Sequence, residues 1–307
     1  MPHVVGRFAP TPSGPLHLGS LFTAVASFLS ARAAGGRWLL RLDDLDRDRL
    51  EPGAETAILR CLEAHGLHWD DAPIRQSARL PLYEAALARL AEDGLLYPCG
   101  CSRAQRRAEG RPGPAGPVYS GRCRDPARRR PGRALRLANP GGELAVDDAL
   151  QGRRRWDLAA AVGDILLRRA DGVIAYHLAN VVDDAELGVS EVVRGADLLD
   201  STPAQALLHR LLGLAPPRWL HLPVLTAADG RKLSKQNRAE PVDVQRSPAN
   251  LARVLVLLGH PPPAALAGAP PAALLEWARQ AWDPARLPQA ETLVLDAKTP
   301  AANATGA

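Results

Sequence analysis

The sequence predicts an α/β protein built on an open parallel sheet, and three observations lead to this fold class. The chain begins with a short apolar, β-branched segment at residues 3–8, and after a Pro- and Gly-rich loop an apolar-periodic helix runs over 18–29. Further short apolar segments, such as 38–42 and 221–225, alternate with amphipathic ones, such as 54–65. With 307 residues, 46% of them hydrophobic, the chain can bury a large core in one or two domains.

Charge and composition narrow the expected partners. The formal net charge is +5 and the sequence pI about 9.3, carried almost entirely by arginine. This excess suits a polyanion such as nucleic acid, although it is also typical of a solvated surface. The only lysines are Lys232, Lys235 and Lys298, and two of them within four residues suggest a chemical role for a flexible ammonium. No apolar run could span a bilayer and no signal peptide is recognisable, so we expect a cytoplasmic protein without a membrane partner.

The loop before the first helix is a candidate nucleotide site. Gly14 and Gly19 allow a ligand to approach the backbone closely, and His17 and Ser20 stand at the mouth of the helix. Backbone N–H groups at a helix N-terminus favour a phosphate. The same pattern also fits an ordinary first strand and helix of an α/β domain, and the residues alone leave both interpretations open.

An acidic cluster, Asp43, Asp44 and Asp46, follows the second predicted strand. Ligands of open α/β sheets bind at this carboxyl end of the strands. The alternative is that these carboxylates cap and begin a helix. In the next predicted helix, Cys61 is expected to be a small core residue and not a metal ligand.

The composition changes after residue 96. Residues 97–140 are dense in Pro, Gly and Arg, which predicts an inserted segment outside the sheet core. Cys99, Cys101 and Cys123 lie in this segment, and three converging thiolates predict a tetrahedral structural zinc site, with free surface thiols as the alternative. A metal would supply much of the order there. The surrounding arginines would contact RNA phosphate or be solvated.

The remaining elements are predicted from local patterns. We expect an RRRW turn at 153–156, and Asp171-Gly172 predicts a hairpin turn between strands at 165–168 and 173–176. A predicted strand ends at Arg194-Gly195, where a guanidinium would grip a carboxylate or simply precede a surface turn. Helices are expected at 82–95, 202–212, 251–258 and 273–282, and a disordered tail after Lys298.

Several motifs, in this order along the chain, resemble those of class I aminoacyl-tRNA synthetases. The sequence LHLG at 16–19 is similar to the HIGH signature, and KLSKQ at 232–236 is similar to the KMSKS loop. The runs RFAPTPSG, RLDDLD and YHLANVVDD, which begin at Arg7, Arg41 and Tyr176, are similar to the glutamyl and glutaminyl branch of the family. The resemblance covers residues 4–236.

This resemblance implies the substrate-binding residues. Two arginines would hold the carboxylates of L-glutamate and an aspartate would face its amino group, in a set comprising Arg7, Phe8, Ala9, Pro10, Thr11, Asp43, Tyr176 and Arg194. ATP, with Mg²⁺ on its phosphates, would contact His17, Gly19, Lys232, Ser234 and Lys235, of which His17 and Lys235 would be catalytic. Two positions depart from the family pattern: Asp43 replaces a glutamate and His177 replaces an asparagine.

A narrower resemblance concerns the cysteines. Cys99, Cys101, Tyr119 and Cys123 match the C-x-C…Y-x-x-x-C arrangement of the glutamyl-Q tRNA(Asp) synthetases, in which the tyrosine completes the Zn²⁺ ligands. Water or Asp125 could take the place of Tyr119. Leu198, where ordinary glutamyl and glutaminyl enzymes have histidine, points to the same tRNA-modifying group.

Taken with this resemblance, the predicted fold is a Rossmann-type class I catalytic domain in two halves, 1–96 and 173–240. A zinc-containing, RNA-facing subdomain at 97–172 would separate them, and a short helical region at 241–307 would replace a full anticodon-binding domain. The implied activity is ATP-dependent formation of glutamyl-adenylate and transfer of glutamate to the queuosine base at the wobble position of tRNA(Asp), by a monomer. The alternatives are a truncated discriminating glutamyl-tRNA synthetase and a zinc-stabilised RNA-binding protein without catalysis.

Overall fold

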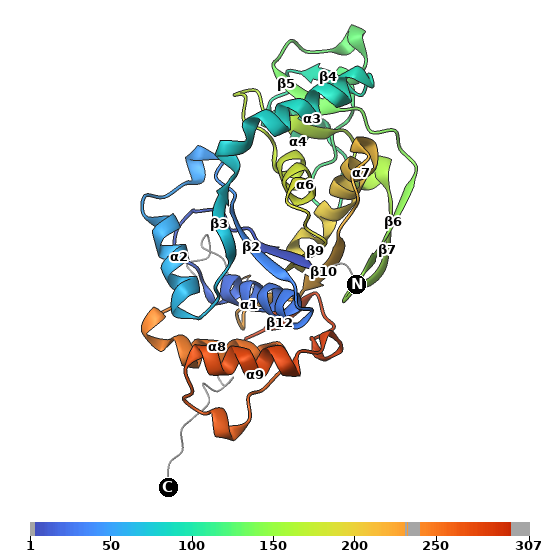
Figure 1. The fold of residues 1–307 in the computed structure, drawn as a ribbon. Helices are drawn as coiled ribbons and strands as arrows, with labels where there is room; N and C mark the ends of the chain where they lie inside the picture. The colour runs from blue at the N-terminus through green and yellow to red at the C-terminus, as the bar shows by residue number, and fades with distance from the viewer. Residues whose placement is uncertain (1–3, 231, 233–239, 296–307) are drawn as a thin grey trace.

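The computed structural model describes residues 4–230, 232 and 240–295 (Figure 1). Parallel strands form its centre: β1 (Val5–Phe8), β2 (Arg37–Leu42), β3 (Asp70–Arg75), β9 (Glu191–Gly195) and β10 (Arg218–Leu222). The backbone N–H of Ser190 donates to the carbonyl oxygen of Val5 over 3.0 Å, so β9 lies beside β1. The paired strands β3-β2-β1 and the pair β9-β10 thus lie side by side, with β1 next to β9, and the predicted open parallel sheet is confirmed.

Helices cover both faces of this sheet (Figure 1). One core contains side chains of α1 (Leu18–Ala33), α2 (Ala54–Ala64), α8 (Ser247–Leu257) and α9 (Pro271–Ala281), and the other those of α3 (Leu80–Glu92), α6 (Tyr176–Glu186) and α7 (Thr202–Leu212). Val192 and Val193 are consecutive in β9 and belong to different cores, because side chains alternate across a strand. Among the described residues, no helix has the length and apolar character needed to cross a membrane.

The C-terminal part packs on α1 and completes the first core. Helices α8 and α9 begin before the predicted residues 251 and 273 because each has a proline in its first turn, where the missing N–H would have no helical partner. A short parallel pair, β11 (Val224–Thr226) with β12 (Thr292–Val294), joins this part to the sheet region. The tail expected to be disordered after Lys298 lies outside the described residues.

The inserted segment forms a small antiparallel sheet of its own at the upper end of Figure 1. Its strands are β4 (Leu96–Cys99), β5 (Ala134–Leu137) and β8 (Ile165–Arg168), in the order β4-β5-β8. The short helix α4 (Arg103–Glu109) follows β4. Tyr97, Cys99, Tyr119 and Cys123 make a separate small cluster there. The change of composition after residue 96 thus coincides with a change of sheet.

The RRRW turn predicted at 153–156 is wrong. These residues belong to β7 (Gly152–Asp157), which pairs antiparallel with β6 (Glu143–Asp148). Arginine has no strong strand preference, so pairing with β6 decides the conformation. Alternate residues of β6, including Asp148, are buried, and the hairpin turn lies against β10, where Ala149 N–H donates to the carbonyl oxygen of Trp219 over 2.9 Å.

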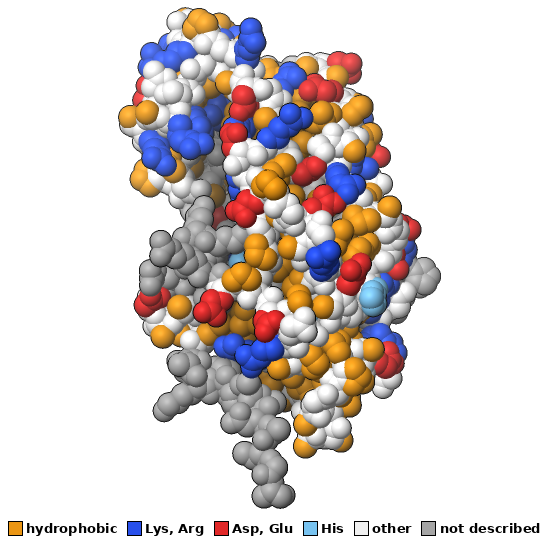
Figure 2. Space-filling view, turned by 90° about the vertical axis from the view of Figure 1, so that its left-hand side faces the viewer, with side chains coloured by type: hydrophobic (Ala, Val, Ile, Leu, Met, Phe, Trp, Pro, Cys, Tyr) orange, Lys and Arg blue, Asp and Glu red, His pale blue; other side chains and the backbone are white. Residues whose placement is uncertain are grey.

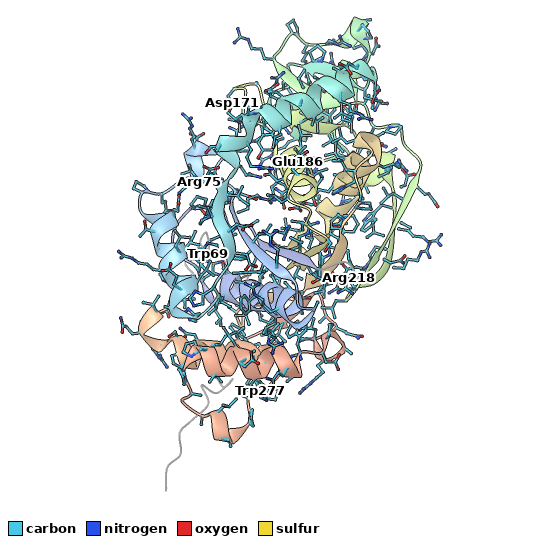
Figure 3. The ribbon with its side chains drawn as sticks, in the orientation of Figure 1. Trp69, Arg75, Asp171, Glu186, Arg218 and Trp277 are labelled. Carbon is cyan, nitrogen blue, oxygen red and sulfur yellow. The ribbon has the colours of Figure 1, made fainter. Side chains whose placement is uncertain are left out.

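The turn predicted at Asp171-Gly172 is present, but its second strand is not. Gly172 has a φ of +89° and donates to the carbonyl oxygen of Arg169 over 3.1 Å, as the turn requires. After it only a single bridge forms, between Arg168 and Ile174, and Tyr176 is the first residue of α6. The apolar spacing after Tyr176 is helical and outweighs the strand-like preference of 173–176. Asp171 marks the turn in Figure 3.

Candidate active site

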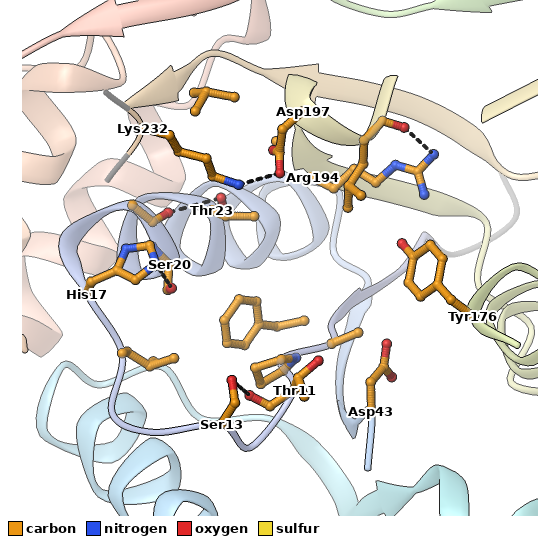
Figure 4. A pocket seen from close by; sticks show the side chains of 18 of the residues that line it. Thr11, Ser13, His17, Ser20, Thr23, Asp43, Tyr176, Arg194, Asp197 and Lys232 are labelled. Carbon is orange, nitrogen blue, oxygen red and sulfur yellow. Dashed lines mark hydrogen bonds and ion pairs between the residues drawn. The ribbon is translucent and has the colours of Figure 1, made fainter. Parts of the chain in front are cut away.

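A cavity of about 810 Å³ opens at the carboxyl ends of β1, β2 and β9 (Figure 4). The chain leaves β1 towards β2 and β3 on one side, whereas β9 and β10 lie on the other, so the cavity is at the switch point where open α/β sheets bind ligands. All the residues expected to bind glutamate line it: Arg7, Phe8, Ala9, Pro10, Thr11, Asp43, Tyr176 and Arg194. The fold brings together residues from both halves of the sequence.

His17 caps the N-terminus of α1 at one side of the cavity. Its Nδ1 accepts a hydrogen bond from the backbone N–H of Ser20 over 3.3 Å, and its Nε2 lies 3.2 Å from Ser20 Oγ. The first turn of α1 holds no acidic residue, so its N–H groups favour an anion. Gly19 lines the cavity in the same turn. This end of the cavity suits a phosphate group.

Lys232, which lies 215 positions after His17 in the sequence, lines the same cavity. Its Nζ contacts the carboxylate of Asp197, as Figure 4 shows. His17 and Lys232 therefore line one cavity. Ser234 and Lys235 lie outside the described residues, so their roles stay predictions.

A buried network of charges lies beneath the predicted glutamate site. Arg41 is fully buried; its Nε donates to Asp43 over 2.8 Å and its Nη1 to Asp184 over 2.7 Å. Arg41 Nη2 donates to Asn180 over 2.8 Å, and Arg7 Nε donates to the same oxygen of Asp184 over 3.3 Å. Arg7 lies in β1 and Asp43 directly follows β2. Arg7 is bonded to α6 directly through Asp184, and Asp43 is connected to α6 through Arg41.

Asp43 and Asp184, two carboxylates of this network, have opposite pKa shifts. Burial raises the pKa of Asp43 and outweighs the opposing effect of Arg41. Burial would also raise the pKa of Asp184, but Arg7 and Arg41 lower it overall. Asp184 is therefore a firmly ionised partner of the two arginines, whereas Asp43 would gain from a nearby cation. A substrate ammonium beside Asp43 would supply that cation.

Asn180 is a cavity residue that the sequence did not single out. It lines the cavity and its Nδ2 donates to Asp43 Oδ2 over 3.4 Å. It lies four residues after Tyr176, so the helical spacing puts both on one face of α6. Within the described part of the chain, His177 is not a lining residue and its buried Nδ1 has no hydrogen-bond partner. Burial, with a smaller effect of Arg194, lowers the pKa of His177 to about 4, so it is neutral at physiological pH.

Cys99, Cys101 and Cys123 form a candidate metal centre in the insert. Their sulfur atoms all lie within 4.8 Å of one another. The hydroxyl oxygen of Tyr119 is 3.5 Å from Cys99 Sγ and 3.3 Å from Cys101 Sγ, so the predicted fourth donor is at the cluster. Asp125, the alternative donor, uses its carboxylate to accept the backbone N–H of its neighbour at 127. Three soft sulfur donors in a largely buried cluster fit Zn²⁺.

Arginines surround this cluster. Arg136 Nε lies 3.4 Å from Cys99 Sγ and its guanidinium stacks 3.9 Å above the Tyr119 ring. Burial would raise the pKa of the Cys123 thiol, but hydrogen bonds from Tyr119 and from the backbone of Arg130 lower it to about 6. A thiolate is the form that binds a metal. Figure 2 shows further basic side chains gathered on this lobe.

Comparison with known proteins agrees with this geometry. The family model for class I tRNA synthetases (E and Q), catalytic domain, matches residues 3–265. The glutamyl-Q tRNA(Asp) synthetase of Methylococcus capsulatus is 53% identical over 285 residues, which are 92% of this chain and 92% of the relative. The enzyme of the same name from Thiobacillus denitrificans is 52% identical over 280 residues, 91% of this chain and 93% of the relative.

Solved structures agree in fold. A glutamate tRNA ligase from Elizabethkingia meningosepticum, in complex with its amino acid, superimposes with a TM-score of 0.79 at 23% identity, covering 97% of this chain and 68% of the ligase. The glutamate–tRNA synthetase of Elizabethkingia anophelis gives 0.80 at 24% identity, covering 96% and 68%. The chain therefore belongs to the class I tRNA synthetases of the E and Q type and, within them, to the glutamyl-Q tRNA(Asp) synthetase family.

Proposed function

We propose that this protein activates L-glutamate with ATP and transfers the glutamyl group to the queuosine base at the wobble position of tRNA(Asp). The observation that carries the proposal is the single cavity shared by Arg7, Asp43 and Arg194 with His17 and Lys232. Two cations and one anion match the two carboxylates and the ammonium of glutamate, and the helix mouth matches a triphosphate. The names of relatives about 50% identical over most of the chain support the choice of tRNA.

Glutamate would occupy the part of the cavity between β1 and β9. Arg7 and Arg194 would each hold one carboxylate, and Asp43 would accept hydrogen bonds from the ammonium. Thr11 and Tyr176 would complete the polar wall. The residues between Arg7 and Thr11, at 8–10, would form the floor of this site.

In the first step, ATP would lie along the N-terminus of α1 with Mg²⁺ on its phosphates. An oxygen of the glutamate α-carboxylate attacks the α-phosphorus, the bond from this phosphorus to the β-phosphate oxygen breaks, and pyrophosphate leaves. His17 and Gly19 would hold the phosphates, while Lys232, Ser234 and Lys235 would stabilise the charge that develops on pyrophosphate. Catalysis is then mainly positioning and charge stabilisation.

In the second step, a hydroxyl of the queuosine cyclopentene ring attacks the carbonyl carbon of the mixed anhydride. AMP leaves with the bonding electrons, and the hydroxyl proton is released. The tRNA would approach along the arginine-rich insert. Zn²⁺ held by Cys99, Cys101, Tyr119 and Cys123 would stabilise this segment. We expect a monomer to act in this way in the cytoplasm, where ATP and tRNA are available.

Amino-acid-dependent ATP–pyrophosphate exchange without tRNA tests the proposal. Exchange should occur with glutamate and with no other standard amino acid. Asp43→Asn should raise the KM for glutamate about 10- to 100-fold, because a hydrogen bond between two charged groups is lost. Asp44→Asn is the matched control, since Asp44 accepts hydrogen bonds from Ser77 and is not a lining residue of the cavity. Binding of tRNA without any exchange would instead favour a non-catalytic RNA-binding protein.

A further inference from the structure

A chain of buried hydrogen bonds connects Arg194 to the β6–β7 hairpin. Arg194 Nε donates to His221 Nε2 over 2.9 Å, and the two residues are direct partners in the register of β9 and β10. His221 Nδ1 lies 2.5 Å from Asp148 Oδ2 at the end of β6. The relative exposures of Arg194, His221 and Asp148 are 4%, 0% and 5%. Neither His221 nor Asp148 takes part in either step of the proposed reaction.

The chemistry of the three groups fixes the direction of these hydrogen bonds. A guanidinium only donates, so His221 Nε2 must accept. The neutral imidazole then carries its proton on Nδ1 and donates it to Asp148. Burial lowers the pKa of His221; Asp148 opposes this shift, while the positive charges of Arg194 and Arg7 add to it. The neutral form with this one tautomer is therefore the form that fits the site.

The other nitrogens of Arg194 are also held. Nη1 donates to Gln205 Oε1 over 2.6 Å, and Nη2 donates to Thr202 Oγ1 over 2.9 Å and to the carbonyl oxygen of Leu198 over 3.3 Å. With the bond to His221, these contacts among the described residues use four of the five guanidinium N–H donors. One N–H on Nη1 is left for a ligand, and its direction is set by the other four.

We propose that Asp148 and His221 are positioning residues for Arg194, which fix the direction in which its remaining N–H meets a carboxylate of the substrate. The inference rests on the proposed function, in which that substrate is glutamate. Asp148 is itself fixed, because its Oδ1 accepts the backbone N–H groups of Leu150 and Gln151 over 3.0 and 2.8 Å. The turn of the hairpin thus determines the geometry of a site on the central sheet.

Asp148→Asn separates positioning from folding. The asparagine oxygen can still accept the backbone N–H groups of the turn, while its NH₂ replaces Oδ2 and donates to His221 Nδ1. The imidazole must then carry its proton on Nε2, where it faces the N–H of Arg194 and the hydrogen bond is lost. We expect the KM for glutamate in pyrophosphate exchange to rise about 10- to 100-fold, while the KM for ATP changes less than about threefold.

Asp147→Asn is the matched control, since Asp147 precedes Asp148 in the hairpin and its side chain is 80% exposed. Its KM for glutamate should stay within about twofold of the wild-type value. Nitrogen-15 NMR of the His221 side chain should show the proton on Nδ1 in the wild type and on Nε2 in Asp148→Asn. His221→Gln, which keeps an acceptor for Arg194, should retain a lower KM for glutamate than His221→Leu.

The outcomes separate this inference from the proposed function. A wild-type KM for glutamate in Asp148→Asn, or a parallel rise in the KM values for glutamate and ATP, would overturn the positioning role and leave the function standing. If Asp148→Asn does not fold, equal KM values for glutamate in His221→Gln and His221→Leu would overturn it. A wild-type enzyme that shows no exchange with glutamate would overturn the proposed function instead.

Discussion

Replacing Arg41 with glutamine should lower the free energy of unfolding by about 3 kcal/mol, because it removes the central cation of a buried network. Arg41 is fully buried; its nitrogens lie 2.8 Å from Asp43, 2.7 Å from Asp184 and 3.7 Å from Asp183. Breaking a buried pair from one side costs about 3–5 kcal/mol. We take the lower end, because Asp184 keeps Arg7 and Asp183 keeps other partners.

Urea unfolding at pH 7 measures this loss, and the control lies on the same strand. Arg37 pairs with Asp71, and the two side chains are 51% and 63% exposed, so Arg37→Gln should cost less than about 1 kcal/mol.

The buried network also makes the free energy of unfolding depend on pH. The pKa of Asp184 is lowered in the folded protein, so its contribution is present above the unfolded pKa near 3.8 and is lost as the pH falls through the folded pKa.

Arg41→Gln removes one of the two arginines that lower the pKa of Asp184. The difference in free energy of unfolding between the wild type and Arg41→Gln should therefore become smaller at acidic pH. Equal urea midpoints for Arg41→Gln and Arg37→Gln at pH 7 would refute this account of the network.

Three further predictions concern other parts of the molecule. His17→Ala should lower kcat for pyrophosphate exchange about 100- to 1000-fold and, because the side-chain cap of α1 is lost, lower the melting temperature by only a few degrees. His68→Ala, at an exposed position, should leave kcat unchanged. Cys99→Ser should lose bound zinc, measured by mass spectrometry, and its insert should become sensitive to trypsin. Cys61→Ser should keep the zinc and the resistance of the insert to trypsin, and a full zinc content in Cys99→Ser would contradict the assignment. Burial lowers the pKa of His221 in the folded protein, so just below a pH of about 6.5 only the unfolded chain binds a proton at this residue. The free energy of unfolding, measured in urea, should therefore decrease as the pH is lowered through this range, and it should decrease less steeply in His221→Gln.

The elements that could be predicted from the sequence are those with a strong local pattern. The first strand, loop and helix follow from apolar periodicity and a Pro- and Gly-rich break, and α1 indeed begins at Leu18. Prediction failed where a segment depends on its neighbours. Residues 153–156 form a strand only because β6 pairs with them. Tyr176 begins a helix, although the residues directly before it have a strand-like pattern.

The candidate site shows the same division. The residues proposed to bind glutamate could be predicted because motif resemblance identifies them one by one, and they do line a common cavity. The chain from Arg194 to Asp148 could not, because it joins residues 27 and 73 positions apart through strand register and burial. No local spacing encodes such contacts. The buried role of Arg41 could not be predicted for the same reason, since its partner Asp184 is 143 positions away in the sequence.

The position of glutamate on the product is the decisive test of the proposed transfer to queuosine. Queuosine-containing tRNA(Asp) is incubated with the protein, ATP and isotope-labelled glutamate, digested to nucleosides and analysed by mass spectrometry, with queuosine-free tRNA(Asp) as the control. We expect labelled glutamate on the queuosine nucleoside and none on the queuosine-free tRNA. Label on the 3′-terminal adenosine, or equal labelling of both tRNAs, would contradict it.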